Sequence, residues 1–124
     1  MSTRSMIGKM NEDGTIEAIY CHFDGYLNGV GATLFEAYQD QKKIDELIYK
    51  GDVSSLGASI NSTSFYPDTH FKTFRDDLAY LDYCFKDNGW IEYCYLWDGE
   101  EWLVCYEYDT PILEFKVLEK ELRD

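Results

Sequence analysis

The chain begins with an alternation of apolar and polar positions that is typical of a β-hairpin. Two strands are predicted, over Ser5–Met10 and Thr15–Phe23, and the connection Asn11–Gly14 between them ends in Asp-Gly. This dipeptide favours the positive φ angles of tight hairpin turns. Both faces of the second strand carry apolar side chains, so we expect that strand to lie in the centre of a sheet.

A helical spacing replaces the alternation after this hairpin. Val30, Leu34 and Tyr38 follow one another at intervals of four residues, which places them on one face of a helix. A second helix is predicted after Asp40, a favourable N-cap, and Gly51 stands where the C-terminal cap of that helix belongs. The two segments together predict a helical hairpin.

The middle of the chain is less regular. Asp52–His70 is rich in Ser, Gly, Thr and Asn and predicts a long loop, with a short strand at Ala58–Ile60 as an option. Thr73 and Asp76 resemble a capping box, in which Asp replaces the usual Glu or Gln. A third helix is therefore predicted from this point up to Asn88-Gly89.

The alternation returns in the last third of the chain. Trp90–Trp97 and Glu101–Tyr108 flank Asp98-Gly99, and this arrangement predicts a second hairpin. Ile112–Leu122, just after Pro111, shows both a period of two and a period of four. We expect a strand first and then a helical tail.

These elements predict an α+β fold, with an antiparallel sheet of N-terminal and C-terminal hairpins packed with about three helices. The 124 residues are a common length for one domain, and we expect a single domain over residues 1–124. The hydrophobic content of 45% is sufficient for a packed core, so disorder is not expected.

The charge narrows the range of partners. There are 11 Lys and Arg against 24 Asp and Glu, which gives a formal net charge of -13. Direct binding to nucleic acid is disfavoured, because such binding depends on cationic contacts to phosphates. An acidic chain can instead dock onto a basic protein surface, including a groove that is built to hold nucleic acid. The alternative is that the charge only keeps a tyrosine-rich surface in solution.

Neither a membrane span nor a signal peptide is evident. No apolar run approaches the roughly 20 residues of a transmembrane helix, and the N-terminus lacks the apolar stretch of a signal peptide. We therefore expect a cytoplasmic protein that does not enter membranes. The cysteines lack CxxC spacing, so reduced and mostly buried thiols are expected at positions Cys21, Cys84, Cys94 and Cys105.

Candidates for catalysis are few. Cys21 and His22 are neighbours, but alternation along a strand places them on opposite faces, whereas His22 and Asp24 share a face and can form an acid–base pair. The alternative is that both have local structural roles. His70 is the other histidine, and no metal-ligand spacing or cofactor motif is present. We expect no metal and no cofactor, and the sequence favours a binding protein over an enzyme.

Aromatic and acidic residues alternate along the C-terminal hairpin. If half of the rings point away from the core, they leave an acidic aromatic surface that suits a basic partner. The alternative is that helices or a symmetry mate cover the second face of the sheet. The partner-binding residues predicted by this pattern are Glu92, Tyr93, Tyr95, Trp97, Asp98, Glu100, Glu101, Trp102, Tyr106, Glu107, Tyr108 and Asp109.

Three stretches, over Thr3–Gly8, Ile19–Tyr26 and Gly51–Gly57, resemble a family of small uncharacterised proteins of bacteriophages and mobile elements. In the pattern of this chain they read TRSxIG, IYCHxDGY and GDxSSLG. The resemblance covers about the first half of the chain. It implies a genomic context in which small acidic proteins often inhibit bacterial defence, anti-CRISPR proteins among them.

Three functions and one mode of assembly follow as expectations. The leading hypothesis is a stoichiometric, anti-CRISPR-like inhibitor whose acidic aromatic surface occupies the basic groove of a host defence nuclease. The second is a module that binds a small molecule or a signalling nucleotide between the helices and the sheet, with a Ser-rich lid over Asp52–Ser64. Its candidate cations are Arg4, Lys72 and Arg75. A small hydrolase using His22 and Asp24 is the third. A homo-oligomer that joins through the aromatic hairpin is also expected.

Overall fold

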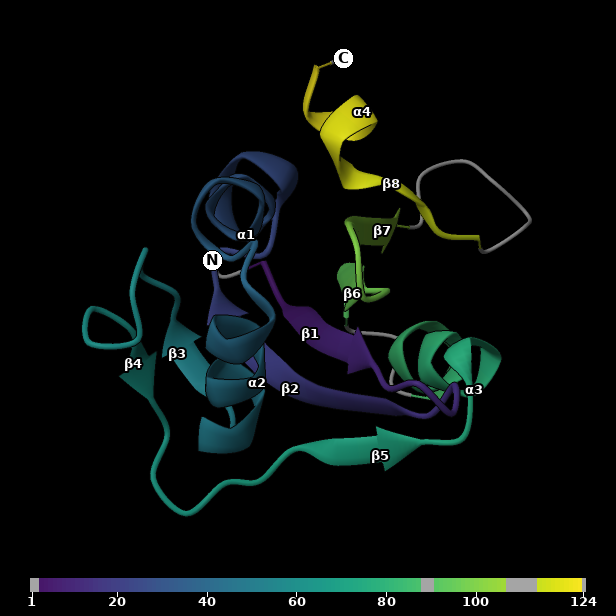
Figure 1. Cartoon of the computed structure of the whole chain (residues 1–124), viewed down its shortest axis with the longest axis horizontal. Coiled ribbons are helices and arrows are strands. Elements are labelled where there is room, and N and C mark those ends of the chain that lie inside the picture. Colours follow the sequence, from purple (N-terminus) through teal and green to yellow (C-terminus); the bar gives the residue numbers. More distant parts are fainter. Residues whose placement is uncertain (1–2, 88–90, 107–113, 124) are drawn as a thin grey trace.

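The computed structural model describes residues 3–87, 91–106 and 114–123. Within these residues eight strands form one sheet in the order β4-β3-β2-β1-β6-β7-β8, and β5 pairs with β2 beside β3 (Figure 1). The strands are β1 (Ser5–Met10), β2 (Ile16–Phe23), β3 (Val53–Ser55), β4 (Ser64–Phe65), β5 (Lys72–Phe74), β6 (Tyr93–Trp97), β7 (Trp102–Tyr106) and β8 (Lys116–Val117). The helices are α1 (Ala32–Ala37), α2 (Gln41–Lys50), α3 (Asp77–Asp82) and α4 (Leu118–Arg123), with π-helical turns η1 (Leu27–Gly31) and η2 (Tyr83–Asp87).

The predicted α+β fold class is confirmed, and the sheet is mixed. Both hairpins are antiparallel, β1 with β2 and β6 with β7. They meet through a parallel pair, in which Ser5 of β1 lies opposite Tyr93 of β6. A second parallel pair joins β2 to β3. Parallel neighbours need a long crossover, which the chain between the two hairpins provides.

Helices cover both faces of this sheet. Side chains of η1, α1, α2 and α4 pack with one face in a core that includes Ile7, Ile19, Tyr95 and Trp102. Side chains of α3 and η2 pack with the other face in a second core that includes Met6 and Leu96. Figure 1 shows α1 and α2 on one side of the sheet and α3 on the other. We call these two sides the α2 face and the α3 face.

Local signals of the sequence account for the ends of the helices. The Asp40 side chain accepts a hydrogen bond from the Lys43 N–H at 3.1 Å, as the predicted N-cap of α2. Asp76, rather than Thr73, caps α3 by accepting from the Ala79 N–H at 2.8 Å, because Thr73 lies within β5.

The predicted loop contains more strand than expected, and at other positions. β3 and β4 lie within Asp52–His70, whereas Ala58–Ile60 forms a bend and no strand. The C-terminal segment forms β8 and then α4, so the predicted order of strand and helix is confirmed.

Candidate functional site

A pocket on the α3 face follows from the alternation along β2. Ala18, Tyr20 and His22 are two residues apart, so their side chains leave the same face of the sheet. The neighbouring strand β1 adds Met6. Arg4 immediately precedes β1, and its carbonyl accepts a hydrogen bond from the Glu92 N–H at 2.9 Å, which fixes the backbone of Arg4. The sheet therefore supplies the floor and one end of the pocket.

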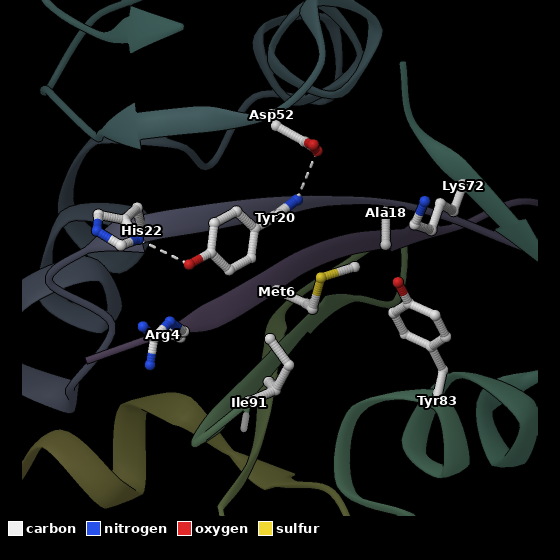
Figure 2. A pocket seen from close by; sticks show the side chains of 9 residues that line it. All are labelled: Arg4, Met6, Ala18, Tyr20, His22, Asp52, Lys72, Tyr83 and Ile91. Atoms are coloured by element: carbon white, nitrogen blue, oxygen red, sulfur yellow. Dashed lines mark hydrogen bonds between the residues drawn. The ribbon is translucent and has the colours of Figure 1, made fainter. Parts of the chain in front are cut away.

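The pocket has a volume of about 330 Å³ and a mostly apolar lining. This volume lies near the lower end of the range for sites that hold small molecules, about 300–1,000 Å³. Figure 2 shows Arg4 and His22 at one end and Lys72 and Tyr83 at the other. The lining residues are Arg4, Met6, Ala18, Tyr20, His22, Asp52, Lys72, Tyr83 and Ile91.

Tyr20 and His22 are joined at one end of the pocket. The Tyr20 hydroxyl lies 2.7 Å from His22 Nδ1, which is hydrogen-bonding distance. Burial raises the pKa of the Tyr20 hydroxyl, while Arg4 acts in the opposite direction through its charge and a side-chain hydrogen bond. The net shift of the pKa is upward, so the hydroxyl keeps its proton at neutral pH.

Asp52 fills a gap in the sheet beside Tyr20. β5 pairs with Ile16–Ala18 of β2, and β3 pairs with the end of β2 from Cys21 onward. The Tyr20 N–H between them donates to Asp52 Oδ1 at 2.9 Å. The carboxylate thus replaces the missing strand carbonyl, and a buried N–H without such a partner would be costly.

The charge of the lining differs in sign from that of the whole chain. Arg4 and Lys72 contribute two positive charges, and Asp52 contributes one negative charge. The pocket is therefore positive by one charge, counting His22 as neutral, in a chain of net charge -13. An anion is the kind of ligand that this local charge favours.

The described rings of the predicted acidic aromatic surface are buried or partly buried. Tyr93, Tyr95, Trp97 and Trp102 are 6%, 0%, 3% and 2% exposed and pack in the core of the α2 face. Tyr106 is partly buried against the same core. For the rings that the structure describes, the prediction that half are exposed is wrong, because these rings share one face and helices cover it.

The acidic residues of that prediction have different settings. Glu92, Glu100 and Glu101 are exposed. Asp98 shapes the hairpin turn, since its Oδ1 accepts from the N–H groups of Glu100 and Glu101 at 2.8 Å each. Glu107, Tyr108 and Asp109 lie outside the described residues. The expectation of a homo-oligomer stays a prediction, but buried rings remove the reason given for it.

The proposed acid–base pair is not brought together in one site. His22 lines the pocket on the α3 face, whereas Asp24 lines a separate hollow with Phe23 and Tyr26. The side chain of His22 is instead within hydrogen-bonding distance of the Tyr20 hydroxyl. Alternation ends with β2 at Phe23, so the shared-face argument does not extend to Asp24.

The remaining sequence candidates lie outside the pocket. The Arg75 side chain is 87% exposed and lies 3.9 Å from Asp76, so Arg4 and Lys72 converge on the pocket without it. His70 is exposed. Of the expected Ser-rich lid over Asp52–Ser64, Asp52 alone is among the lining residues. Sequence reasoning missed Tyr20, Met6, Ala18, Tyr83 and Ile91, although the period of β2 already groups Ala18, Tyr20 and His22, and it expected Asp52 only as the start of a lid.

All four cysteines are buried and free, so we expect them to resist alkylation in the folded protein. Burial raises the pKa of Cys21 to about 12, which leaves almost no reactive thiolate at about pH 8. Mass spectrometry after treatment with iodoacetamide should find the native chain unmodified and the chain in denaturant carrying four labels. Rapid labelling of Cys21 in the native chain would contradict the burial and reopen a nucleophilic role.

Three stretches of the chain, residues 3–8, 19–26 and 51–57, meet at this pocket. Arg4 and Met6 come from the first stretch, Tyr20 and His22 from the second, and Asp52 from the third. They lie on or beside the adjacent strands β1, β2 and β3. Segments that are distant in the sequence thus contribute to one cavity.

Comparisons with protein-family models, with curated proteins and with solved structures gave no match. Among the residues that the structure describes, no group of three or more His, Cys, Asp or Glu side chains is arranged to hold a metal ion. None of the helices in the described segments has the length and apolar character needed to cross a bilayer. The function is therefore inferred from the chain's own residues.

Proposed function

We propose that this protein is a binding module that holds one small anionic molecule in the pocket on the α3 face. The observation that carries the proposal is the convergence of Arg4 and Lys72 on an apolar cavity in a chain of net charge -13. Apolar walls with a few placed polar groups are typical of sites for small ligands. This corresponds to the second of the functions expected from the sequence.

Capture without turnover is the mode of action that the side chains favour. His22 and Asp24, the expected acid–base pair, line different hollows, and the Cys21 thiol is buried with a pKa of about 12. Stoichiometric capture also agrees with the phage context that the resemblance implies. In that context the captured molecule is a small anionic signal of the host, a nucleotide derivative being the expected class.

Inhibition of a defence nuclease through a basic groove stays a second hypothesis. The charge of -13 supports it, and the exposed Glu92, Glu100 and Glu101 remain available to a partner. The buried rings of β6 and β7 remove the aromatic anchors that the hypothesis relied on. The pocket therefore supports ligand capture better.

The proposal predicts that phenyl phosphate binds in the pocket and that Arg4→Met weakens this binding at least tenfold. A hydrogen bond or ion pair to a charged group contributes about 1.5–3 kcal/mol, and 1.4 kcal/mol corresponds to a factor of ten. Titration of ¹⁵N-labelled protein, followed by NMR, gives the affinity. The same spectra place the probe through the amide shifts of Ala18, Tyr20 and Lys72.

Arg75→Met is the matched control, because it removes the same charge from an exposed side chain outside the pocket. It should leave the affinity within about twofold of the parent protein, since the charge of an exposed side chain outside the pocket is screened by salt. Equal losses in the two variants, or amide shifts that avoid the pocket at millimolar probe, would refute the proposed site.

A further inference from the structure

The register of the sheet holds the two cations of the pocket at opposite ends. Lys72 of β5 lies opposite Ala18 of β2. Arg4 immediately precedes β1, whose first residue pairs with Cys21, so Arg4 lies level with His22. Positions 18 and 22 of one strand are about 13 Å apart, because each residue of a strand advances by about 3.3 Å. Figure 2 shows the same arrangement, with Arg4 at one end of the pocket and Lys72 at the other.

Both cations have donors to offer to a ligand. Lys72 is exposed, and among the residues that the structure describes its ammonium group forms no ion pair and no hydrogen bond. The guanidinium group of Arg4 carries five N–H donors, so a contact with one neighbour leaves other donors for a ligand. Each end of the pocket therefore combines a positive charge with hydrogen-bond donors.

The middle of the pocket is unsuited to an anionic group. Met6 and Ile91 are buried apolar residues of its lining, and Figure 2 shows the Tyr20 ring next to Met6. Asp52 lies between the two ends in the same view, with its Oδ1 atom on the Tyr20 N–H at 2.9 Å. Its carboxylate repels a second negative charge placed nearby. The middle therefore suits a flat apolar ring, and anionic groups belong at the two ends.

A ligand that fills the pocket takes water away from both cations. A monoanion leaves one of them without a charged partner, and an unpaired charge that loses water is costly. Side chains stand roughly perpendicular to a sheet, so the two charges are separated by a distance similar to that between their levels on β2. Each charged hydrogen bond spans about 2.8 Å, which leaves about 7 Å between the two anionic groups. A six-membered ring with groups on two opposite carbon atoms fits this length.

We propose that the ligand has two anionic groups, one at each end of a flat apolar centre. One group binds Arg4, the other binds Lys72, and the ring between them lies over Met6 beside Tyr20. Lys72 is then the residue that selects a ligand with two anionic groups over one with a single anionic group. This inference rests on the proposed function and adds the number of anionic groups and their separation.

Three probes with the same ring and the same phosphate test the inference. 4-Carboxyphenyl phosphate adds a carboxylate on the carbon opposite the phosphate, and we expect it to bind about three- to tenfold more tightly than phenyl phosphate. This gain lies between that of an exposed ion pair and that of a charged hydrogen bond. 4-Carbamoylphenyl phosphate has nearly the same shape without the second charge, so its gain should stay below about twofold. Titrations of ¹⁵N-labelled protein followed by NMR give all three affinities.

Substitutions of Lys72 assign the gain to one side chain. Lys72→Met should bind 4-carboxyphenyl phosphate no more tightly than phenyl phosphate, and Lys72→Glu should bind it less tightly, because the charge at that end is reversed. Lys42→Met is the matched control: it removes the same charge from an exposed side chain of α2, outside the pocket lining, and should keep the gain. Both lysines are exposed, so these variants should fold as the parent protein does.

Three results would overturn the inference: no gain from the carboxylate in the parent protein, an equal gain in Lys72→Met, or an equal gain from the neutral amide. Its failure differs from failure of the proposed function. If phenyl phosphate shifts the amides of the pocket and binds more weakly to Arg4→Met, while the carboxylate adds nothing, the second anionic group is refuted and the proposed function stands. Amide shifts outside the pocket for all three probes would overturn both.

Discussion

Replacing Trp102 with alanine is expected to lower the free energy of unfolding by about 3–5 kcal/mol, the usual cost of removing a large buried ring. The side chain is 2% exposed, and its indole N–H donates to the Tyr38 carbonyl at 2.7 Å. Its ring lies 5.5 Å from that of Trp97, centre to centre. Truncation would leave a cavity in the α2-face core and an unpaired carbonyl.

Urea denaturation of the isolated chain measures this loss, and Glu101→Ala is the control. Glu101 is exposed at the next position, so its replacement should change the free energy of unfolding by less than about 0.5 kcal/mol. If Trp102→Ala does not fold, Trp102→Phe provides a milder change that should still cost about 1–3 kcal/mol. An unchanged stability would restore Trp102 to an exposed, partner-binding role.

Gly51→Ala is expected to lower the free energy of unfolding by about 2–4 kcal/mol, the second largest effect after that of Trp102→Ala. Gly51 has a φ of +99°, where a side chain is strained, and an added Cβ would lie 2.4 Å from the Thr69 carbonyl oxygen. Thr69 cannot move freely, because its hydroxyl oxygen accepts from the Asp52 N–H at 2.8 Å. The steric clash therefore affects Asp52, whose carboxylate accepts the hydrogen bond from the Tyr20 N–H.

Gly99→Ala separates strain from collision. Gly99 has a similar φ of +106°, but nothing lies within 4 Å of an added Cβ. Its replacement by alanine should lower the free energy of unfolding by about 1–2 kcal/mol, because of backbone strain alone. Thermal unfolding ranks the two variants, and NMR should show a shift of the Tyr20 amide in Gly51→Ala only. Equal losses of stability in the two variants, or an unchanged chemical shift of the Tyr20 amide in Gly51→Ala, would contradict the link between Gly51 and the pocket.

The local elements could be predicted from the sequence because local interactions determine them. Alternation identified β1, β2, β6 and β7, and Asp-Gly identified both hairpin turns. Asp40 capped α2 through a contact to the third residue beyond it. Each of these signals acts over a few residues, so no knowledge of the rest of the chain is needed.

The exposure of the aromatic rings could not be predicted in the same way. Alternation shows that Tyr95 and Trp97 share a face of β6, but it does not show how many faces are covered. The number of covered faces depends on helices on both sides of the sheet, and these helices come from segments that are far apart in the chain. The rings of Tyr93, Tyr95, Trp97 and Trp102 lie on one face of the sheet, so a single layer of helices is enough to bury all four.

The pocket illustrates the same division between local and distant causes. The sequence alone placed Ala18, Tyr20 and His22 on one face of β2, and it named Arg4 and Lys72 among the cations able to hold an anion. The tertiary structure alone brought Asp52 to the Tyr20 N–H, 32 positions away, and Tyr83 to the far wall. Strand and turn preferences are properties of neighbouring residues, whereas a cavity depends on which distant segments pair. That pairing is decided by burial of the whole sheet, so the composition of the pocket becomes visible only in the folded chain.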